Sequence, residues 1–279
     1  MTNKQKIIAY YDECEPDYKV IWDLDKSLAM HYGYWDGKVK NLRDALRREN
    51  EILAQKAHIK ESDLVLDAGC GVGGSSIYLA ENIGCNVIGI SLSKKQVETA
   101  TKNSLARNLK DKVTFKQMDF TKMEFRNNQI DVVLAVESIC CSSRRKDFVE
   151  ESYRVLKKGG RLIVADFFAG KKCDAPGKEL MKRLSNGWAT NKLDSAVQFK
   201  MYLKNAGFKN ILYSNVTTYI LPSSKMLYRY SLPGILLWKS GQFMGLTTKL
   251  RVENAKACYY QYKSLQRNLW EYGIFYAEK

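Results

Sequence analysis

The sequence lacks several features that would assign it to a secreted, membrane-spanning or metal-stabilised class. Its first twenty residues contain no long apolar run of the kind found in a signal peptide. No stretch offers about 18 uninterrupted apolar residues, so we expect no transmembrane helix. The seven cysteines form no CxxC pair, which speaks against a zinc site and against a disulfide framework. We therefore expect a cytoplasmic protein with reduced thiols and no bound metal.

Basic residues outnumber acidic residues. The 279 residues include 45 Lys and Arg against 30 Asp and Glu, which gives a net charge of +15. From Lys225 to the end there are nine basic and three acidic residues. Such a charge favours acidic partners, for example nucleic acid or an anionic membrane surface. Plain solubilisation is the alternative interpretation.

Short apolar runs alternate with helical patterns between residues 61 and 168. This alternation is typical of βαβ units, in which helices cover both faces of a parallel sheet. Five strands are expected in this part, and two more over 210–221 and at the end of the chain. The sequence therefore predicts an α/β fold with a doubly wound, mostly parallel seven-stranded sheet.

The chain shows no internal repeat and no low-complexity linker, and we expect four parts. These are an N-terminal helical cap over 1–60, an α/β core over 61–221, a helical lid insertion over 222–268 and the final strand of the core over 269–279. Within the core we expect a turn at "KKGG" (157–160) and a polar connection over 170–192.

The stretch "VLDAGCGVGGSS" (65–76) follows the pattern of a nucleotide-binding turn. Its glycines at 69, 71 and 74 come after the first strand and open a helix. In an open α/β sheet, ligands bind outside the carboxyl ends of the strands. Glycines let the backbone approach the ligand, and the helix N-terminus presents free N–H groups there. Dinucleotide enzymes and methyltransferases both use this spacing.

Two residues decide between these ligands. Asp67 ends the strand beside the turn, where a carboxylate would repel a pyrophosphate but attract an ammonium group. A nicotinamide enzyme should also carry an acidic residue for the ribose at the end of the second strand. The chain has Ser91 at that place. Both observations favour S-adenosylmethionine.

Five motifs resemble those of class I S-adenosylmethionine-dependent methyltransferases in order and spacing: "VLDAGCGVGG", "VIGISLSKKQ", "MDF", "VVLAVES" and "RVLKKGGRLIVADFF". Within this class the chain looks most like the group of tocopherol and sterol methyltransferases and cyclopropane-fatty-acid synthases. "HYGYWDG" upstream is also similar to a motif of that group. The resemblance covers roughly residues 28–220 and implies that 61–221 is a Rossmann-like core that binds S-adenosylmethionine.

The resemblance also implies a set of cofactor-binding residues. The turn would shape the pocket for the methionine part of the cofactor. The segment after the second strand, together with Gln96, would bind the ribose. The residues after the third strand would lie against the adenine. Ser93 and Gln96 equally fit the spacing of a capping box. The full set is Tyr32, Asp67, Gly69, Cys70, Gly71, Gly73, Ser91, Leu92, Gln96, Asp119 and Phe120.

Glu137, His31 and Cys141 are the candidate catalytic residues. Glu137 ends the fourth strand, where a carboxylate can act as a base or stabilise a developing cation; orienting a neighbouring loop is the alternative. The family pattern often has a histidine four residues later, where this chain has Cys141. A cysteine would act only if its neighbours lowered its pKa, and a buried apolar thiol is the alternative. His31 is then the histidine placed to reach the site.

Aromatic residues are candidates for the acceptor site, because their faces attract a sulfonium or a carbocation. The candidates are Tyr34, Trp35, Trp188, Tyr228 and Trp238. Packing in the core is the alternative for much of this set. The segment 231–245 combines apolar and basic residues, so it either rests on an anionic membrane or packs as a lid on the domain.

The sequence therefore predicts methyl transfer from S-adenosylmethionine to a small hydrophobic acceptor such as a sterol, isoprenoid, lipid or phenol. O-, C- and N-methylation and cyclopropanation stay open, as does the oligomeric state. An RNA or DNA methyltransferase is the alternative that the net charge favours. The chain has "AVES" where base-amino methyltransferases carry an Asn/Asp-Pro-Pro-aromatic motif, and it has no Pro-Cys pair, so nucleic acid is not the expected partner. A small-molecule amine N-methyltransferase and a non-enzymatic binding module are further alternatives.

Overall fold

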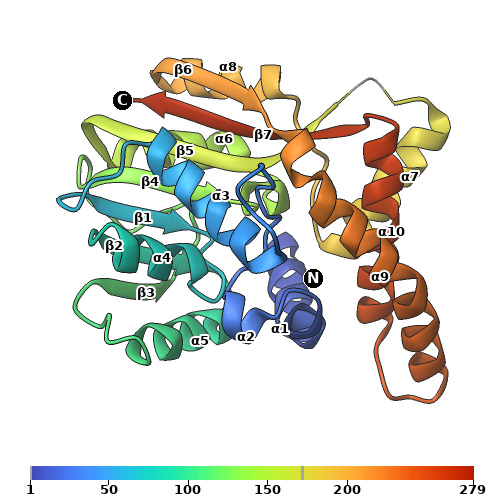
Figure 1. Ribbon diagram of the computed structural model, residues 1–279. Coiled ribbons are helices and arrows are strands. Elements are labelled where there is room, and N and C mark those ends of the chain that lie inside the picture. Colours follow the sequence, from blue (N-terminus) through green and yellow to red (C-terminus); the bar gives the residue numbers. More distant parts are fainter. Residues whose placement is uncertain (1, 171–172) are drawn as a thin grey trace.

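The computed structural model describes residues 2–170 and 173–279, whose strands form one seven-stranded sheet (Figure 1). The order is β3-β2-β1-β4-β5-β7-β6. β7 runs antiparallel to both of its neighbours, and the other neighbouring pairs are parallel. The strands are β1 (Leu64–Ala68), β2 (Asn86–Ser91), β3 (Val113–Gln117), β4 (Ile130–Val136), β5 (Leu156–Ala169), β6 (Lys209–Asn215) and β7 (Trp270–Glu278). The predicted doubly wound, mostly parallel sheet is confirmed.

Helices alternate with the strands and also form the N-terminal cap and the insertion before β7. They are α1 (Asn3–Ile21), α2 (Leu24–Ser27), α3 (Leu42–Lys56), α4 (Gly74–Asn82), α5 (Lys94–Leu105), the 3-10 turn η1 (Ile139–Cys141), α6 (Arg145–Val155), α7 (Ala175–Trp188), α8 (Ala196–Ala206), α9 (Thr217–Phe243) and α10 (Lys249–Gln266).

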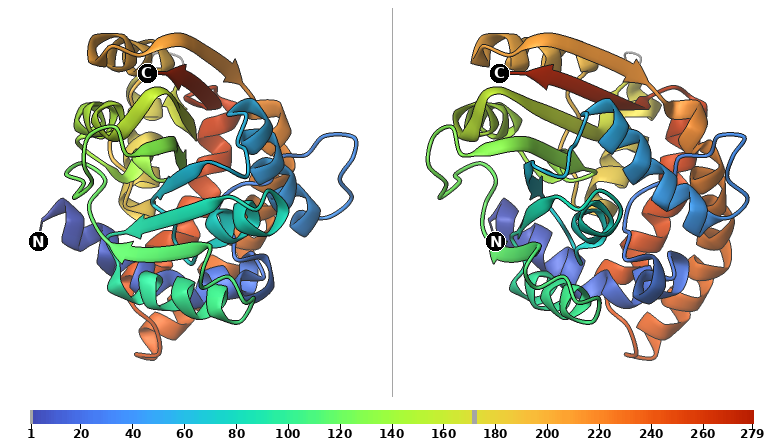
Figure 2. Two further views of the ribbon diagram at one scale, coloured as in Figure 1. Left: turned by 90° about the vertical axis from the view of Figure 1, so that its left-hand side faces the viewer. Right: turned by 60° about the vertical axis from the view of Figure 1, so that its left-hand side comes forward.

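The sheet is buried on both faces (Figure 2). Neighbouring strand residues point to opposite faces, so Val65 joins one apolar cluster and Leu66 the other. The cluster around Val65 includes Leu46 and Leu53 of α3. The cluster around Leu66 includes Phe148 of α6 and Phe199 of α8. The inner strands β1 and β4 are therefore almost continuously apolar, whereas the edge strands β3 and β6 are partly exposed and carry polar residues.

The segment after β6 differs from the strand expected over 210–221. β6 ends at Asn215, and α9 begins at Thr217. Val216 and Ile220 are buried at a spacing of four residues, which a helix places on one face. The β-branched residues between them gave this stretch the appearance of a strand. The α9–α10 hairpin that follows projects from the body of the molecule (Figure 1).

Two local expectations in the core were also wrong. The polar connection expected over 170–192 contains the helix α7, whose start is capped by the Asp174 side chain accepting from Gly177 N–H; residues 171 and 172 lie outside the described part. The turn expected at 157–160 is a bulge inside β5, where pairing with β4 shifts register and Gly159 has a φ of +72°. β5 thus continues through a local irregularity.

Among the helices formed by residues 2–170 and 173–279, none is long and apolar enough to cross a membrane.

Replacing Phe275 by Ala should test how strongly the aromatic cluster between β5, β6 and β7 stabilises the fold. The Phe275 ring is 1% exposed and lies 5.2 Å from the ring of Phe168 and 4.6 Å from that of Tyr213. Removing it should lower the free energy of unfolding by about 3–5 kcal/mol in urea denaturation. Leu212→Ala on β6, where the side chain is 63% exposed, should change it by less than about 0.5 kcal/mol. Equal losses for the two variants would contradict this account.

Candidate active site

A cavity of about 400 Å³ lies at the carboxyl edge of the sheet, where the loops after β1, β2, β3 and β4 meet. The N-terminal helix α1 and the segment 28–31 close it from the other side. This is the edge at which open α/β sheets bind ligands. The predicted residues among its walls are His31, Asp67, Gly69, Cys70, Gly71, Ser91, Leu92, Gln96, Asp119, Phe120, Glu137 and Cys141.

The glycine turn after β1 is packed so closely that larger residues would not fit. Gly69 has a φ of +97°, and a Cβ there would lie 2.3 Å from Ser138 Cβ. Gly71 has a φ of +53°, and its Cβ would lie 2.6 Å from Met30 Cε. Gly73 does not line the cavity; it caps α4 and lies against the ring of Phe115. The turn therefore brings bare backbone to the cavity wall.

Asp67 places a carboxyl group at the end of β1. It is buried, and its Oδ2 accepts a hydrogen bond of 2.7 Å from Ser76 Oγ. Burial raises the pKa of Asp67 to about 6, although the bond from Ser76 opposes this. A cationic ligand group in the cavity would favour the carboxylate.

Ser91 and Gln96 face each other after β2. Ser91 Oγ donates to Gln96 Oε1 at 2.7 Å, which directs the Gln96 side chain back toward the end of β2. Ser93 Oγ accepts from Gln96 N–H at 3.1 Å and so caps α5. The cap therefore coexists with a Gln96 side chain that lines the cavity.

Asp119, after β3, is held by three partners. Its carboxylate lies 2.5 Å from Lys4 Nζ and accepts bonds of 2.8 Å from the N–H and Oγ1 of Thr121. Burial raises the pKa of Asp119, but these partners outweigh it and hold the pKa below its usual range. The ring of Phe120 packs edge-on against Phe148, with centroids 5.2 Å apart.

Glu137 is the first residue beyond β4 and has a strained backbone. Its φ is +45°, in the left-handed region that is costly for a residue with a Cβ. Glu137 Oε1 accepts a hydrogen bond of 2.6 Å from the backbone N–H of Tyr32. Burial, with the nearby Glu49 carboxyl, raises the pKa of Glu137 well above its usual value.

His31 lies beside this contact as a neutral ring. Its Nδ1 is 2.7 Å from the carbonyl oxygen of Tyr32, so that nitrogen carries the proton and donates it. Nε2 is buried and makes no hydrogen bond within residues 2–170 and 173–279. Burial lowers the pKa of His31 to about 4. Nε2 is thus an available acceptor at the cavity wall.

A second, smaller cavity of about 50 Å³ adjoins the first. Both are lined by Tyr11, Met30, Glu137 and Cys141, which therefore form the boundary between them. Seven of the 17 residues that line the smaller cavity are aromatic: Tyr10, Tyr11, Tyr18, Trp22, Tyr32, Phe167 and Trp188. Tyr32, predicted as a cofactor residue, thus lines this chamber and not the larger one.

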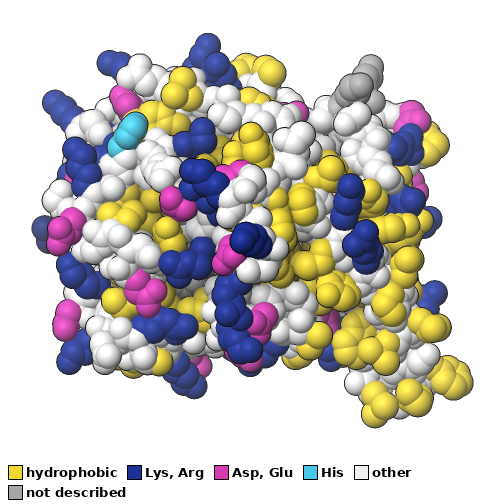
Figure 3. Space-filling model, viewed as in Figure 1, with side chains coloured by type: hydrophobic (Ala, Val, Ile, Leu, Met, Phe, Trp, Pro, Cys, Tyr) yellow, Lys and Arg dark blue, Asp and Glu magenta, His cyan; other side chains and the backbone are white. Residues whose placement is uncertain are grey.

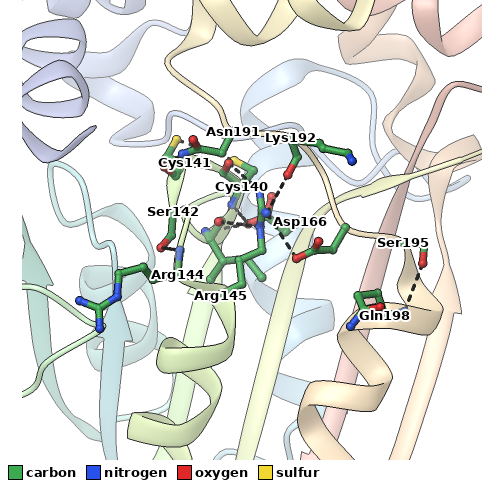
Figure 4. Close-up of polar contacts among 12 residues, drawn as sticks. Cys140, Cys141, Ser142, Arg144, Arg145, Asp166, Asn191, Lys192, Ser195 and Gln198 are labelled. Carbon is green, nitrogen blue, oxygen red and sulfur yellow. Dashed lines mark hydrogen bonds and ion pairs between the residues drawn. The ribbon is translucent and has the colours of Figure 1, made fainter. Parts of the chain in front are cut away.

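Asp166 and Arg145 fix the loop after β4 (Figure 4). The Asp166 carboxylate accepts from the N–H groups of Ile139 at 2.8 Å and Cys140 at 3.1 Å. Arg145 donates to the carbonyl oxygens of Ile139 and Cys140 at 3.1 and 3.0 Å. Cys141 follows on the same loop. The loop that carries the boundary residues is therefore held from both sides.

Cys141 has two neighbours that can share a proton with it. Its Sγ lies 3.6 Å from Tyr11 Oη and 3.9 Å from Cys140 Sγ. The hydrogen bond from Cys140 lowers the pKa of Cys141, and burial opposes this. Its role in catalysis stays a prediction.

Four predicted acceptor residues lie outside both cavities. Tyr34 stacks on Tyr219 with ring centroids 4.3 Å apart, and Trp35 Nε1 donates to Ser223 Oγ at 2.8 Å. Tyr228 packs against Tyr259 and Tyr262 in the hairpin, and Trp238 lies under the Arg251 guanidinium. Trp188, by contrast, lines the smaller cavity. For the other four residues, binding of the acceptor stays a prediction, because none of them lines either of the two cavities.

Sequence reasoning missed the contribution of α1. Lys4, Ile7, Ile8 and Tyr11 line the larger cavity from this helix. The apolar and aromatic spacing in "IIAYY" (7–11) was the available signal, but it does not tell which surface the helix covers. Met30 was also missed, although it lies one residue before the aromatic motif.

Comparison with known proteins identifies the family. A family model described as a methyltransferase domain matches residues 66–164. A 27-O-demethylrifamycin SV methyltransferase of Amycolatopsis mediterranei is 32% identical over 199 residues, which cover 70% of this chain and 71% of that protein. The chain belongs to the S-adenosylmethionine-dependent methyltransferases.

One further relative and one solved structure are also similar to this chain. A sterol 24-C-methyltransferase of Saccharomyces cerevisiae is 32% identical over 204 residues, which cover 72% of this chain and 52% of that enzyme, so the match spans about half of its length. The structure of a cyclopropane synthase of Mycobacterium tuberculosis superposes with a TM-score of 0.84 over 100% of this chain and 99% of that one. At 14% identity, this second likeness shows the fold alone.

The pH dependence of S-adenosylmethionine binding should report the role predicted for Asp67. If this carboxylate holds the ammonium group of the cofactor, binding requires the deprotonated form. Because the pKa is about 6, affinity should fall by about tenfold per pH unit below this value and level off above it. Calorimetric titration between about pH 5 and 8 measures this change.

Asp67→Asn should bind weakly throughout this range, with no change of slope near pH 6. Asp111→Asn, which alters an exposed carboxyl after α5, is the matched control and should keep the profile of the unchanged protein. A profile that stays the same in Asp67→Asn would contradict the assignment.

Proposed function

We propose that this methyltransferase binds S-adenosylmethionine in the larger cavity and methylates a hydrophobic acceptor of the sterol, isoprenoid, lipid or polyketide class in the smaller one. The observation that carries the proposal is the meeting of the two cavities at Glu137. The larger chamber carries the buried Asp67 carboxyl on the loops of the sheet, and seven of the 17 residues that line the smaller one are aromatic. This pairing suits a charged donor and an apolar acceptor.

The residues of the larger cavity fit the cofactor. The Asp67 carboxylate would hold the ammonium group, the bare turn at Gly69 and Gly71 would face the methionine part, and Ser91 with Gln96 would reach the ribose. Phe120 would cover the adenine. When bound, S-adenosylmethionine supplies an activated methyl group and a positive charge.

Glu137 would remove a proton from the acceptor at its Oε2 atom or stabilise positive charge there. Its Oε1 is already bonded to Tyr32 N–H, so the carboxylate plane is fixed at the boundary. Burial favours the protonated acid, whereas a positive charge in the larger cavity favours the carboxylate. With S-adenosylmethionine bound, Glu137 would therefore be ionised and could act as a base at the place where the acceptor arrives.

The aromatic walls would orient the acceptor and support developing positive charge. The rings of Trp22 and Phe167 pack edge-on against Tyr32, with centroids 6.1 and 5.7 Å away. Such a surface attracts a cation through its π faces and excludes water. Because the chamber holds only about 50 Å³, we infer that the reacting end of the acceptor enters it and that the rest lies along the α9–α10 side.

The function is tested by incubating the protein with methyl-labelled S-adenosylmethionine and, separately, a sterol, a prenyl alcohol, an unsaturated fatty acid, a macrolide polyketide and total RNA. Label should enter an organic-extractable product, and mass spectrometry of that product identifies the methylated atom. Label in RNA alone, or transfer to none of these acceptors, would overturn the proposal.

Glu137→Gln should lower kcat by about 100-fold or more, because general base catalysis commonly contributes 10²–10⁴. Affinity for S-adenosylmethionine should change little, because the substitution keeps the shape of the side chain. Initial rates with the identified acceptor and calorimetric binding measure the two effects.

Glu49→Gln is the matched control. Burial raises the pKa of Glu49 to about 8, so its carboxyl is neutral near pH 7, and its Oε1 accepts from Tyr272 Oη at 2.8 Å. An amide preserves both features, and turnover should stay close to that of the unchanged enzyme. If Glu137→Gln turned over as fast as Glu49→Gln, Glu137 would have a structural role only.

A further inference from the structure

One face of α9 is exposed along most of the helix and carries both basic and apolar side chains. Because each helical residue advances by about 100°, positions three, four and seven apart share a face. We call this face the α9 stripe. It consists of Lys225, Arg229, Leu232, Leu236, Lys239 and Phe243, all of them exposed.

The apolar part of the stripe gathers at the tip of the projecting hairpin. Leu236 is 70% exposed and Phe243 is 95% exposed. Leu237, Met244 and Leu246 extend the apolar surface around the turn to α10. Figure 3 shows hydrophobic side chains gathered on the part of the molecule that projects from the body. A contiguous apolar patch on a protruding element marks a binding surface.

The basic part of the stripe has no compensating charge. Residues 195–252 contain eight Lys and Arg and no Asp or Glu. Within residues 2–170 and 173–279, none of Lys225, Arg229 and Lys239 forms an ion pair. Lys225 and Arg229, one helical turn apart, also line a shallow hollow of about 340 Å³ together with Tyr230. These donors match the phosphate of a lipid headgroup.

We propose that the α9 stripe docks the protein on a bilayer that contains anionic phospholipid. Leu236 and Phe243 enter the boundary between headgroups and acyl chains, and Lys225 and Arg229 bind headgroup phosphates. Apolar and basic residues on one exposed helical face are the pattern of helices that lie in this interface. A second copy of the chain is a poorer occupant, because a symmetric contact through the stripe would bring uncompensated cations together.

Docking would place the bilayer beside the acceptor side of the active site. Leu227 of α9 and Cys258 of α10 line the smaller cavity, so the same hairpin forms both the wall and the docking surface. A lipid-soluble acceptor could then pass from the bilayer along the hairpin. Only this last step rests on the proposed function; docking does not.

Flotation with vesicles tests the proposal on the full chain. One set is phosphatidylcholine alone, and in the other a third of it is replaced by phosphatidylglycerol. The protein should float with the anionic vesicles, remain in solution with the neutral ones, and dissociate as the salt concentration rises. Lys225→Ser/Arg229→Ser should weaken binding by about 30-fold, because each cation near an anionic surface contributes about fivefold. Leu236→Ser/Phe243→Ser should weaken it by at least about tenfold.

Matched control variants test whether vesicle binding depends on the stripe itself or only on the number of exposed cations and apolar side chains. Lys56→Ser/Lys60→Ser removes two exposed cations at the amino edge of the sheet, and Leu105→Ser/Val197→Ser removes two exposed apolar side chains on α5 and α8. Both should bind anionic vesicles within about threefold of the unchanged protein. Unchanged S-adenosylmethionine binding shows that every variant is folded.

Three results would overturn the proposal: equal binding to both vesicle types, no binding to either, or equal losses in stripe and control variants. If no vesicles were bound and light scattering showed a dimer that Leu236→Ser/Phe243→Ser dissociates, the face would belong to a second copy. Failure to methylate any acceptor would leave the vesicle results unchanged, so the two proposals fail separately.

Discussion

The hydrogen bond from the Tyr32 N–H to Glu137 Oε1 joins the N-terminal cap to the edge of the sheet. Its donor sits in a segment without regular structure, and its acceptor sits on a backbone with a positive φ. The bond places the His31 ring on the wall of one cavity and the Tyr32 ring on the wall of the other. Separation of the two chambers therefore depends on a contact between residues 105 positions apart.

Buried acidic groups lie at the ligand-binding edge of the sheet, whereas the net charge of the chain is positive. Three buried carboxyls, Asp67, Glu137 and Asp166, lie at the carboxyl edge of the sheet, and burial raises the pKa of each. Asp67 and Glu137 line the larger cavity, where they favour a cation. The chain as a whole has a net charge of +15, and the α9 stripe presents part of its positive charge next to apolar side chains. A cationic cofactor and an anionic surface thus fit different parts of one chain.

Much of the site could be predicted because its residues belong to short motifs at the ends of strands. Parallel strands end at a common edge, so Asp67, Ser91, Asp119 and Glu137 must meet once the sheet forms. The contribution of α1 could not be predicted in the same way. Its helical pattern shows that one face is buried, but which surface covers that face depends on packing between distant segments. The same limit applies to the aromatic residues, whose apolar surface serves core and cavity equally well.

The sequence by itself determined the fold class, the edge of the sheet that binds ligand and the kind of cofactor, because periodicity and turn chemistry are local properties. Only the tertiary structure decided that Trp188 lines a cavity while Tyr34 and Trp238 do not, and that Glu137 lies between two chambers. It also decided that the apolar and basic residues of α9 share one exposed face. These outcomes depend on contacts between segments far apart in the chain, and no local pattern encodes which of the available apolar surfaces will be covered.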